Sequence, residues 1–569
     1  MSINKISVEN FRVFKDKTEF ELAPITLLTG PNNSGKSSFT KFLDLLSSNY
    51  KNPSGFSVLD FIKGKHQLGE FNNIINWDSN SELLSFELDF PLSYFDENFK
   101  IQFNYSSYQE NGVLHSFKIY NKKRTLLDVH EIESDNAIDG KGHFQSKGSH
   151  QIHLSCKLDI KYIKETINTY RKEDKNTKNL LFEYRSEAGI IDSNNHSLFY
   201  KLEELIFSQE NLEASFYSNI NENHFINFFK KSVSQEEYEY DNFELHNLTS
   251  FFHRYLDLQE DLQEDLQEGD PNLIENNLYK KYVNLNIFFI RGSAETRKIF
   301  DEIFINNIYK GLQSLNKQFS SFSFLSANRG NKDRIFLNDS NYEINLLIRE
   351  FNKFVNIKSS YFIFLKESFI ILGIKGVLKI KRVESFGTLL YVEQKNRDVL
   401  LSDLGYGLSQ VIPILLKILI ESDKIFKAQN DQMHIEGYGK TRKEIEKKIF
   451  PTITIEEPEA NLHPKLQSKL ADIFVLAYKT FGVHFIIETH SEYLIRKLQY
   501  LTAKEELTTN ESVIYYFNDD EYVSKKEKKV KKIEINKFGG LTDTFGPGFY
   551  DEATTLQFEL LKLNKERNN

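Results

Sequence analysis

A short glycine-rich stretch near the N-terminus carries the clearest chemical signal in the sequence. Residues 30–37 read Gly-Pro-Asn-Asn-Ser-Gly-Lys-Ser, and the apolar run Ile25-Thr26-Leu27-Leu28 precedes them. With this spacing the glycines let the backbone curl until successive N–H groups point at phosphate oxygens. Lys36 would then reach the β- and γ-phosphates of a nucleotide, while the Ser37 hydroxyl would hold Mg²⁺. We expect the phosphates to be bound by Gly30, Asn32, Asn33, Ser34, Gly35, Lys36, Ser37 and Ser38.

Two adjacent carboxylates end a short apolar strand in the last third of the chain. The run Ile453-Thr454-Ile455 leads directly into Glu456 and Glu457. Carboxylate oxygens are preferred ligands of Mg²⁺, so we expect Glu456 to hold the ion directly or through its waters. Glu457, one residue further, would orient or deprotonate the attacking water. The pair therefore predicts hydrolysis of the bound nucleotide.

A histidine ends the next predicted strand. Residues 485–487 are Phe-Ile-Ile, and Glu488-Thr489-His490-Ser491 follows them. Parallel sheets place ligand-contacting groups at the carboxyl ends of their strands. We therefore expect His490 to contact the γ-phosphate.

A second candidate phosphate cradle lies at residues 401–410, which read Leu-Ser-Asp-Leu-Gly-Tyr-Gly-Leu-Ser-Gln. Glycines and a serine at the start of a helix can bind an anion. One nucleotide does not need two cradles in the same chain, so this one would grip the γ-phosphate of a nucleotide held by a partner chain. Either Ser402 or Ser409 could supply the hydroxyl, and Ser409 is preferred because it stands at the predicted helix start. The expected contacts in trans are Gly405, Gly407, Ser409 and Gln410.

Length and composition narrow the class of protein. At 569 residues the chain predicts two or more domains, and 40% hydrophobic residues are enough for sizeable cores. The single cysteine, Cys156, excludes a disulfide framework and a Cys-based zinc site within one chain. The net charge of −9 argues against general affinity for nucleic acid. Without a signal-peptide core or an apolar run of ~18 residues, we expect a cytoplasmic protein that makes no membrane contact.

Hydrophobic periodicity indicates the elements that position these groups. Alternating apolar residues predict two strands before residue 25 and then the strand that enters the glycine-rich loop. From 83 to 119 the period is again two, and Asn111-Gly112 predicts a hairpin turn, so we expect an antiparallel meander. Residues 150–320 change to helical spacing and contain three Asp-Leu-Gln-Glu repeats at 257–268. We interpret this segment as a compact helical insertion.

Strand-like patterns return in the last part of the chain, followed by helices. The predicted strands are 361–365, 369–372, 377–380, 389–392, 453–455 and 484–487. The predicted helices are 410–420 and 464–479, separated by a polar surface excursion over 421–449. The chain thus divides into an N-terminal half of a nucleotide-binding head over 1–125, an insertion over 126–320, and the C-terminal half of the head over 321–569.

In this order the motifs resemble the ABC-type ATPase head of the SMC, RecF and OLD (overcoming lysogenization defect) branch. Several stretches also resemble the bacterial AAA-family ATPases of anti-phage defence systems, of the Septu or retron-linked type. These stretches are GPNNSGKSS (30–38), LSANR (325–329), LGYGLSQVIPIL (404–415), EEPEANLHP (456–464), ETHSEYL (488–494) and GPGFYDE (546–552). The resemblance covers roughly residues 1–125 and 320–555.

The resemblance implies an α/β fold, in which the P-loop ATPase head joins a mixed sheet and helices to an antiparallel β-meander and a helical insertion. It implies ATP and Mg²⁺ as cofactors and slow ATP hydrolysis in a homodimer or higher homo-oligomer closed through the heads. It further implies a sensor or regulatory subunit of a defence complex, with a separate HNH nuclease as effector, and leaves open a contact with DNA or RNA.

Three departures from the family pattern bear on function. The segment 401–410 lacks the Leu-Ser-Gly-Gly spelling of the ABC signature, and no motif marks the Q-loop glutamine, for which Gln67 is a candidate. OLD nucleases carry a Toprim domain with an acidic metal cluster, whereas Asp519-Asp520-Glu521 lacks its Glu-Gly context. We therefore expect no intrinsic nuclease activity. Two alternatives stay open: a RecF-like DNA-repair ATPase, and a nucleotide-gated scaffold with little turnover.

Overall fold

The protein is described from a computed structural model. It describes residues 3–50, 56, 58–95, 97–108, 110–133, 152–159, 162–163, 165–166, 212–217, 304, 306–329, 334–337, 342–351, 359–384, 386–394, 397–435, 449–519, 528–546, 549–550 and 556–563. The tetrapeptide repeat at 257–268 and most of the predicted helical insertion lie outside these residues.

The chain divides into two compact units. The first unit comprises Met1–Lys5, Arg12–Ser47 and Gln318–Asn569, and the second comprises Ile6–Phe11 and Ser48–Lys317. The glycine-rich loop and all the predicted carboxylate, histidine and signature residues belong to the first unit. The predicted domains group residues 48–125 with the head instead, and that division stays a prediction.

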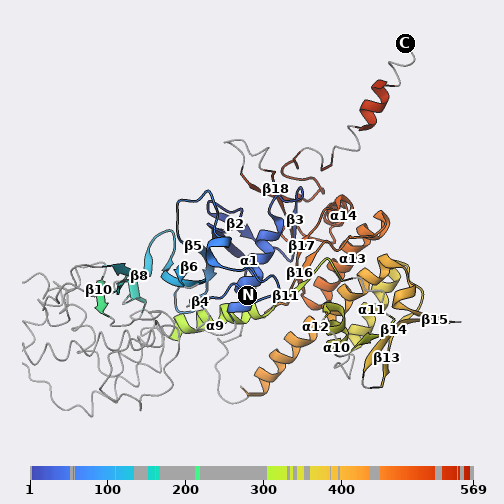
Figure 1. Cartoon of the computed structure of the whole chain (residues 1–569), viewed down its shortest axis with the longest axis horizontal. Coiled ribbons are helices and arrows are strands. Elements are labelled where there is room, and N and C mark those ends of the chain that lie inside the picture. Colours follow the sequence, from blue (N-terminus) through green and yellow to red (C-terminus); the bar gives the residue numbers. More distant parts are fainter. Residues whose placement is uncertain are drawn as a thin grey trace, which may run out of the picture. The chain divides into compact units, whose positions relative to one another are not determined.

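A six-stranded sheet forms the centre of the first unit (Figure 1). Its first five strands are parallel, and the last pairs antiparallel with its neighbour. Every residue of β3 and β18 is buried, which is typical of parallel strands covered on both faces. In spatial order the strands are β11 (Phe322–Leu325), β16 (Thr452–Glu456), β17 (His484–Glu488), β3 (Ile25–Thr29), β18 (Ser512–Phe517) and β19 (Val530–Glu534).

Side-chain caps and turn residues define the ends of the two helices on either side of β17. In α13 (Pro464–Phe481), Pro464 opens the helix, His463 accepts from the N–H of Lys465, and Gly482 ends it with φ 73°. In α14 (Glu492–Ala503), the Ser491 hydroxyl accepts from the N–H of Leu494. These caps fix the turns on both sides of β17. The other helices are α1 (Lys36–Asn49), α10 (Glu343–Phe351), α11 (Ser359–Leu372) and α12 (Tyr406–Ile435).

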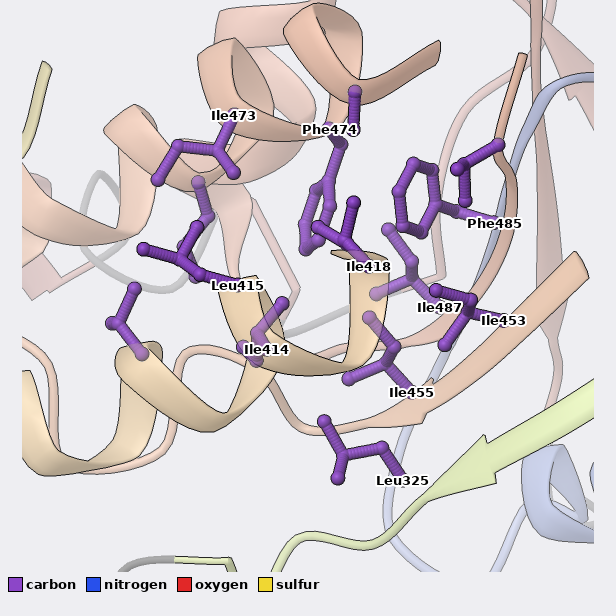
Figure 2. Packing of buried hydrophobic residues seen from close by; sticks show 14 of the residues in the cluster. Leu325, Ile414, Leu415, Ile418, Ile453, Ile455, Ile473, Phe474, Phe485 and Ile487 are labelled. Carbon is purple, nitrogen blue, oxygen red and sulfur yellow. The ribbon is translucent and has the colours of Figure 1, made fainter. Parts of the chain in front are cut away.

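A large apolar core joins these helices to the sheet (Figure 2). Isoleucine and leucine side chains of α12 meet the side chains of α13 and of the strands β11, β16 and β17. Truncating such a side chain to alanine typically costs ~2–5 kcal/mol. The core therefore holds the carboxyl ends of the parallel strands in place. The labelled members are Leu325, Ile414, Leu415, Ile418, Ile453, Ile455, Ile473, Phe474, Phe485 and Ile487.

One prediction in this part of the chain is wrong, and another gives a helix that is too short. Residues 361–365 and 369–372, predicted as strands, form the single helix α11. Its buried residues Tyr361, Phe364, Phe369 and Leu372 follow helical spacing, but their types favour strands, and this misled the prediction. The helix predicted over 410–420 spans 406–435 instead, so Pro413 lies in its interior and part of the expected surface excursion is helical.

A smaller antiparallel sheet confirms the other predicted strands of this region. Its order is β12-β14-β13, and β15 also pairs with β14. The bounds are β12 (Phe336–Leu337), β13 (Val377–Val383), β14 (Gly387–Gln394) and β15 (Arg397–Leu400).

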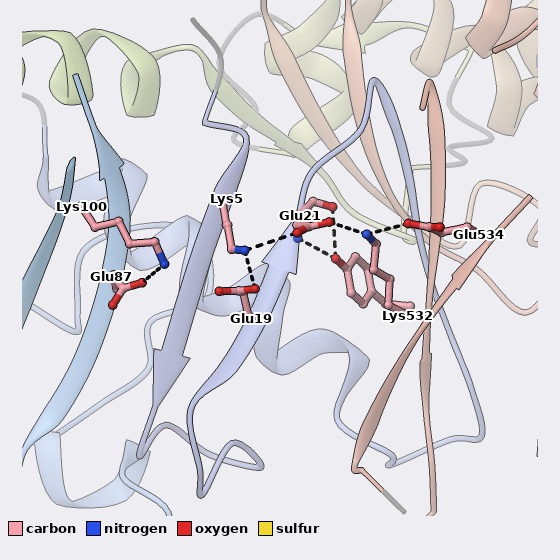
Figure 3. Close-up of polar contacts among 8 residues, drawn as sticks. Lys5, Glu19, Glu21, Glu87, Lys100, Lys532 and Glu534 are labelled. Carbon is pink, nitrogen blue, oxygen red and sulfur yellow. Dashed lines mark hydrogen bonds and ion pairs between the residues drawn. The ribbon is translucent and has the colours of Figure 1, made fainter. Parts of the chain in front are cut away.

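The N-terminal segment of the first unit is attached to β18 and β19 through a polar network (Figure 3). The Tyr515 hydroxyl accepts from the N–H of Glu21 at 2.6 Å and donates to its carbonyl at 3.1 Å, at the end of β2 (Thr18–Glu21). Lys5 pairs with Glu19 and Glu21, and Lys532 pairs with Glu21 and Glu534. The hydrogen bond from Lys532 lowers the pKa of Glu21. Strands far apart in the sequence are thereby held together.

The second unit contains the antiparallel meander predicted over 83–119, and β8, β9 and β10 extend its sheet into the segment predicted as a helical insertion. The strand order is β10-β9-β8-β7-β6-β5-β1, and β4 also pairs with β7. Asn111 and Gly112 belong to β7, so the hairpin turn precedes them, with Glu110 at φ 73°. The bounds are β1 (Lys5–Glu9), β4 (Val58–Leu59), β5 (Leu84–Phe90), β6 (Phe99–Tyr108), β7 (Asn111–Tyr120), β8 (Thr125–Glu133), β9 (Ile152–Leu158) and β10 (Leu212–Tyr217), and the helices are α2 (Phe71–Ile74) and α9 (Asn306–Ser320).

In neither unit do the described residues include a helix with the length and hydropathy needed to cross a membrane.

Candidate functional site

The glycine-rich loop connects β3 to α1, and its shape requires its glycines. Gly30 and Gly35 have φ of 143° and 103°, which side-chain-bearing residues rarely adopt. A Cβ on Gly30 would lie 2.3 Å from the carbonyl oxygen of Phe517, and one on Gly35 would lie 2.5 Å from Cγ2 of Val13. Both contacts are too short, so neither position can carry a side chain without moving its neighbours. The loop therefore has the compact curl that a phosphate cradle needs.

Lys36, the first residue of α1, lies over this loop. Its Nζ donates to the carbonyls of Gly30 at 3.0 Å and Pro31 at 2.7 Å, and the residue is only 5% exposed. Burial lowers the pKa of Lys36, while the charges of Glu488, Glu457 and Glu459 oppose this shift. The ammonium therefore stands among carboxylates at the loop. Of the remaining loop residues, Ser34 and Ser38 are buried, Ser37 is half-buried, and Asn32 and Asn33 are exposed.

Strand register brings the carboxylates to the same edge of the sheet as the loop. Glu456 at the end of β16 pairs in register with Glu488 of β17, which in turn pairs with Leu28 of β3. The Ser37 hydroxyl donates to Oε1 of Glu488 at 2.6 Å. Glu488 is thus part of the site, although the sequence analysis assigned no role to it. Its position within the ETHSEYL stretch, directly before Thr489-His490, was the available signal.

Glu457 and His490 lie on the exposed side of this cluster. Glu457 has the left-handed φ of 41°, and its N–H donates to the carbonyl of Glu488 at 2.7 Å. The N–H of His490 donates to Oε1 of the buried Glu459 at 2.6 Å. Partial burial of the imidazole and the nearby charge of Lys36 lower the pKa of His490, whereas burial raises the pKa of Glu459. The lowered pKa favours the neutral form of the His490 imidazole.

Arg329, four residues after the end of β11 at Leu325, connects the carboxylate turn to helix α12. Its guanidinium donates to the carbonyls of Glu456 at 2.7 Å, Glu457 at 2.6 Å and Ser326 at 2.8 Å, and Nε donates to that of Gln410 at 3.3 Å. The residue is 1% exposed, and burial lowers its pKa to about 10. The LSANR resemblance marked Arg329 without giving it a role, and the structure supplies one: it holds the backbone that carries both glutamates.

The predicted signature segment forms the start of α12. Gly405 is exposed with φ 87°, and a Cβ placed on it would meet nothing within 4 Å. Gly407 faces the turn after β16, where a Cβ would lie 3.0 Å from Cδ2 of Leu462. Ser409 is 4% exposed and Gln410 is equally buried, one turn into the helix, whereas Ser402 is half-buried and bonds Asp403. Within the segment, Asp403 and Gly405 are therefore exposed, whereas Ser409 and Gln410 are buried.

The two other predicted features are the candidate Q-loop residue Gln67 and the acidic run at 519–521. Gln67 belongs to the second unit and has φ of 41°. Asp519 is described but its acidic neighbours are not, and the described part of the chain contains no group of three His, Cys, Asp or Glu residues with metal-binding geometry.

Family comparison agrees with this geometry. The model of the AAA ATPase domain family matches residues 1–495, from the first strand to helix α14. The chain belongs to the AAA ATPase domain family. A second model, for a protein family of unknown function (DUF3696), matches residues 507–560 of this AAA ATPase. No curated protein matches the chain. The parallel sheet that carries the loop and the carboxylates, with helices packed against it, confirms the predicted α/β fold.

Solved structures similar to this AAA ATPase include heads of Smc proteins. An Smc head with an extended coiled coil from Pyrococcus furiosus, bound to the C-terminal domain of ScpA, is 12% identical over 98% of this chain and 99% of its own, with a TM-score of 0.29. The SMC head domain from Thermotoga maritima is 10% identical over 91% and 94%, with a TM-score of 0.31. At such scores the likeness adds nothing to the fold assignment.

Replacing Arg329 by methionine should destabilise this AAA ATPase strongly. The carbonyl oxygens of Ser326, Gln410, Glu456 and Glu457 would lose a buried donor, and removal of one buried charged partner typically costs ~3–5 kcal/mol. Urea unfolding monitored by circular dichroism measures the loss. Arg496→Met is the matched control, because Arg496 is exposed and pairs with Glu492 on its own helix, and it should cost less than ~1 kcal/mol. Equal losses in the two variants would contradict the role given to Arg329.

Proposed function

We propose that this AAA ATPase binds ATP with Mg²⁺ and hydrolyses it. The observation that carries the proposal is the register of β16, β17 and β3, since it brings Glu456, Glu488 and the loop with Lys36 and Ser37 to one edge of the sheet. Parallel α/β sheets bind ligands at this edge. The family match supports the same reaction.

The residues present fit ATP and Mg²⁺. The loop is curled tightly enough that a Cβ on Gly30 or Gly35 would overlap its neighbours, and it opens α1 at its N-terminal, partially positive end. The Ser37 hydroxyl and the Glu456 carboxylate are the oxygen ligands that Mg²⁺ prefers. Bound Mg²⁺ would neutralise charge on the β- and γ-phosphates. Gly30, Asn32, Asn33, Ser34, Gly35, Lys36 and Ser38 would bind the phosphates.

Glu457 is the proposed general base. It is exposed at the edge of the cluster, and both of its backbone polar groups are bonded. Its N–H donates to the Glu488 carbonyl, and its C=O accepts from Arg329. This backbone support suits a group that must hold a water in line with the γ-phosphate. His490, whose lowered pKa favours the neutral imidazole, would donate a hydrogen bond to the γ-phosphate. Lys36 would leave a loop carbonyl and pair with the phosphates.

Glu457→Gln should keep ATP binding and slow hydrolysis by ~10²-fold or more, because a positioned general base is typically worth ~10²–10⁴. Phosphate release measures turnover, and a fluorescent ATP analogue measures affinity. Lys36→Ala is the companion variant and should lose the affinity itself. Normal hydrolysis by Glu457→Gln, with turnover abolished by Glu456→Gln alone, would mean that the two glutamates have the opposite roles.

We also propose that two heads close on ATP. The segment with Gly405, Gly407, Ser409 and Gln410 would cover the nucleotide of a second copy in a symmetric, isologous pair. The exposed Gly405 and the first N–H groups of α12 would make the direct contact, since Ser409 and Gln410 are buried. ATP would favour the closed pair and hydrolysis would release it, which is a population shift that a partner could detect.

Mixing two inactive variants tests this arrangement. Lys36→Ala removes the nucleotide of its own chain, and Gly405→Asp would repel the partner's γ-phosphate. Any side chain is strained on the left-handed backbone of Gly405, but Asp and Asn adopt it more readily than most residues, and the space beside the Cα is open. In mixed dimers one composite site carries both changes and the other carries none, so ATPase activity should partly recover. Gly405→Asn, with the same size and no charge, should stay active. Mixed dimers without recovery would mean that the segment does not act in trans.

The resemblance to defence ATPases supports a more specific proposal, in which the ATP state controls a separate effector nuclease of the HNH type. Copurification from the native operon, with and without ATP, tests this role. We expect an HNH nuclease to copurify. Recovery of DNA-repair proteins instead would favour the RecF-like alternative, and ATP-dependent capture of a partner without turnover would favour a scaffold.

A further inference from the structure

Glu488 makes contacts that the roles assigned above leave unexplained. It stands at the carboxyl end of β17, is 7% exposed, and accepts the Ser37 hydroxyl at 2.6 Å through Oε1. Its other oxygen, Oε2, is buried and has no hydrogen-bond partner among the described residues. A buried polar atom is normally bonded, because leaving it unpaired costs ~1–3 kcal/mol and more for a charged group. A half-satisfied carboxylate at this position therefore calls for another partner.

The electrostatic surroundings restrict what that partner can be. Glu456 is the register neighbour of Glu488 on β16, and the N–H of Glu457 bonds the Glu488 carbonyl. The charges of Glu456 and Glu457 therefore act on Glu488, and Lys36 is the cation whose charge opposes theirs. An additional anion is unfavourable here, whereas a cation or its coordinated water is favoured by charge.

We propose that Glu488 is a second carboxylate of the Mg²⁺ site, which orients the Ser37 hydroxyl toward the ion and accepts a hydrogen bond from its bound water through Oε2. The inference rests on the nucleotide site proposed above and adds a residue to it. The Ser37 hydroxyl has one hydrogen, and it donates this hydrogen in the bond to Glu488. The lone pairs of the Ser37 oxygen are therefore left for the metal. Supporting groups of this kind typically contribute 10–100-fold to metal affinity.

The same carboxylate should also make nucleotide binding conditional on the metal. Without Mg²⁺, the negative charge of Glu488 lies within one strand of the loop and repels the triphosphate. With Mg²⁺, that charge stabilises the ion between protein and nucleotide. Removing the charge should therefore weaken binding of Mg·ATP while leaving metal-free ATP bound equally well or more tightly. A residue that only supports the fold would weaken both.

The test is a titration of a fluorescent ATP analogue at pH 8, once with Mg²⁺ and once with EDTA, on the full chain. Glu488→Gln keeps the size of the side chain and an oxygen that can accept the Ser37 hydrogen bond, but removes the charge. We expect the Mg²⁺-dependent gain in affinity to shrink by about 10–100-fold in this variant. Glu421→Gln is the matched control. Glu421 is likewise buried but pairs with Lys417 and Lys424 on α12, and its replacement should leave the gain unchanged.

Each outcome decides between explanations. Equal loss of affinity with Mg²⁺ and with EDTA in Glu488→Gln, or no loss in either, would overturn the role of Glu488 and leave the nucleotide site intact. If the wild-type chain shows no Lys36-dependent binding under either condition, the nucleotide site itself is wrong and the inference with it. If Glu488→Gln does not fold, Glu488→Asp replaces it; the retained charge should preserve weak EDTA affinity while the shorter reach lowers the Mg²⁺-dependent gain.

Discussion

Strand β17 lies between the loop-bearing strand β3 and β16, and its hydrogen bonds to both neighbours decide where the chemical groups of the head stand. Adjacent strands are ~4.8 Å apart, so Glu456 lies two strands, or about 10 Å, from the loop strand, and Glu488 lies only one. The wider gap leaves space for an ion with its waters and for phosphate, while the narrower one permits the direct bond between Glu488 and Ser37. The core beneath α12 and α13 preserves these spacings because it packs against all three strands.

A second constraint acts on the turn that follows β16. Glu457 has a left-handed backbone, which costs a non-glycine residue ~1–2 kcal/mol. The Glu488 carbonyl holds its N–H, and Arg329 holds its C=O. Because Arg329 also bonds the Gln410 carbonyl, the start of α12 and the carboxylate turn share one buried donor. A shift of α12 would therefore be transmitted to the backbone of Glu457 through a single side chain.

The sequence predicted the parts of this head that local patterns encode. The three N-terminal strands, the meander, β16, α13 and β17 are confirmed, because each combines a clear period with recognisable ends. The α11 segment was mispredicted because Tyr, Phe and Ile favour strands, and tertiary packing overrode that preference. Glu488 and Arg329 acquire their roles only through register and long-range contact. No spacing rule predicts that a glutamate before Thr-His contacts Ser37, or that an arginine after a strand bonds the turn of Glu456 and Glu457.

The position of β3 has a consequence for the order in which the head can assemble. Thr26 pairs in register with Ile486 on one side and Val513 on the other, so the central strand waits for partners made near the end of the chain. Contacts of such large sequence separation form slowly, and domains begin to fold while they are being synthesised. The loop of residues 30–37 leaves the ribosome early without the sheet that shapes it. The sheet around the loop is therefore complete only after residues 512–534, which contain β18 and β19, have been synthesised.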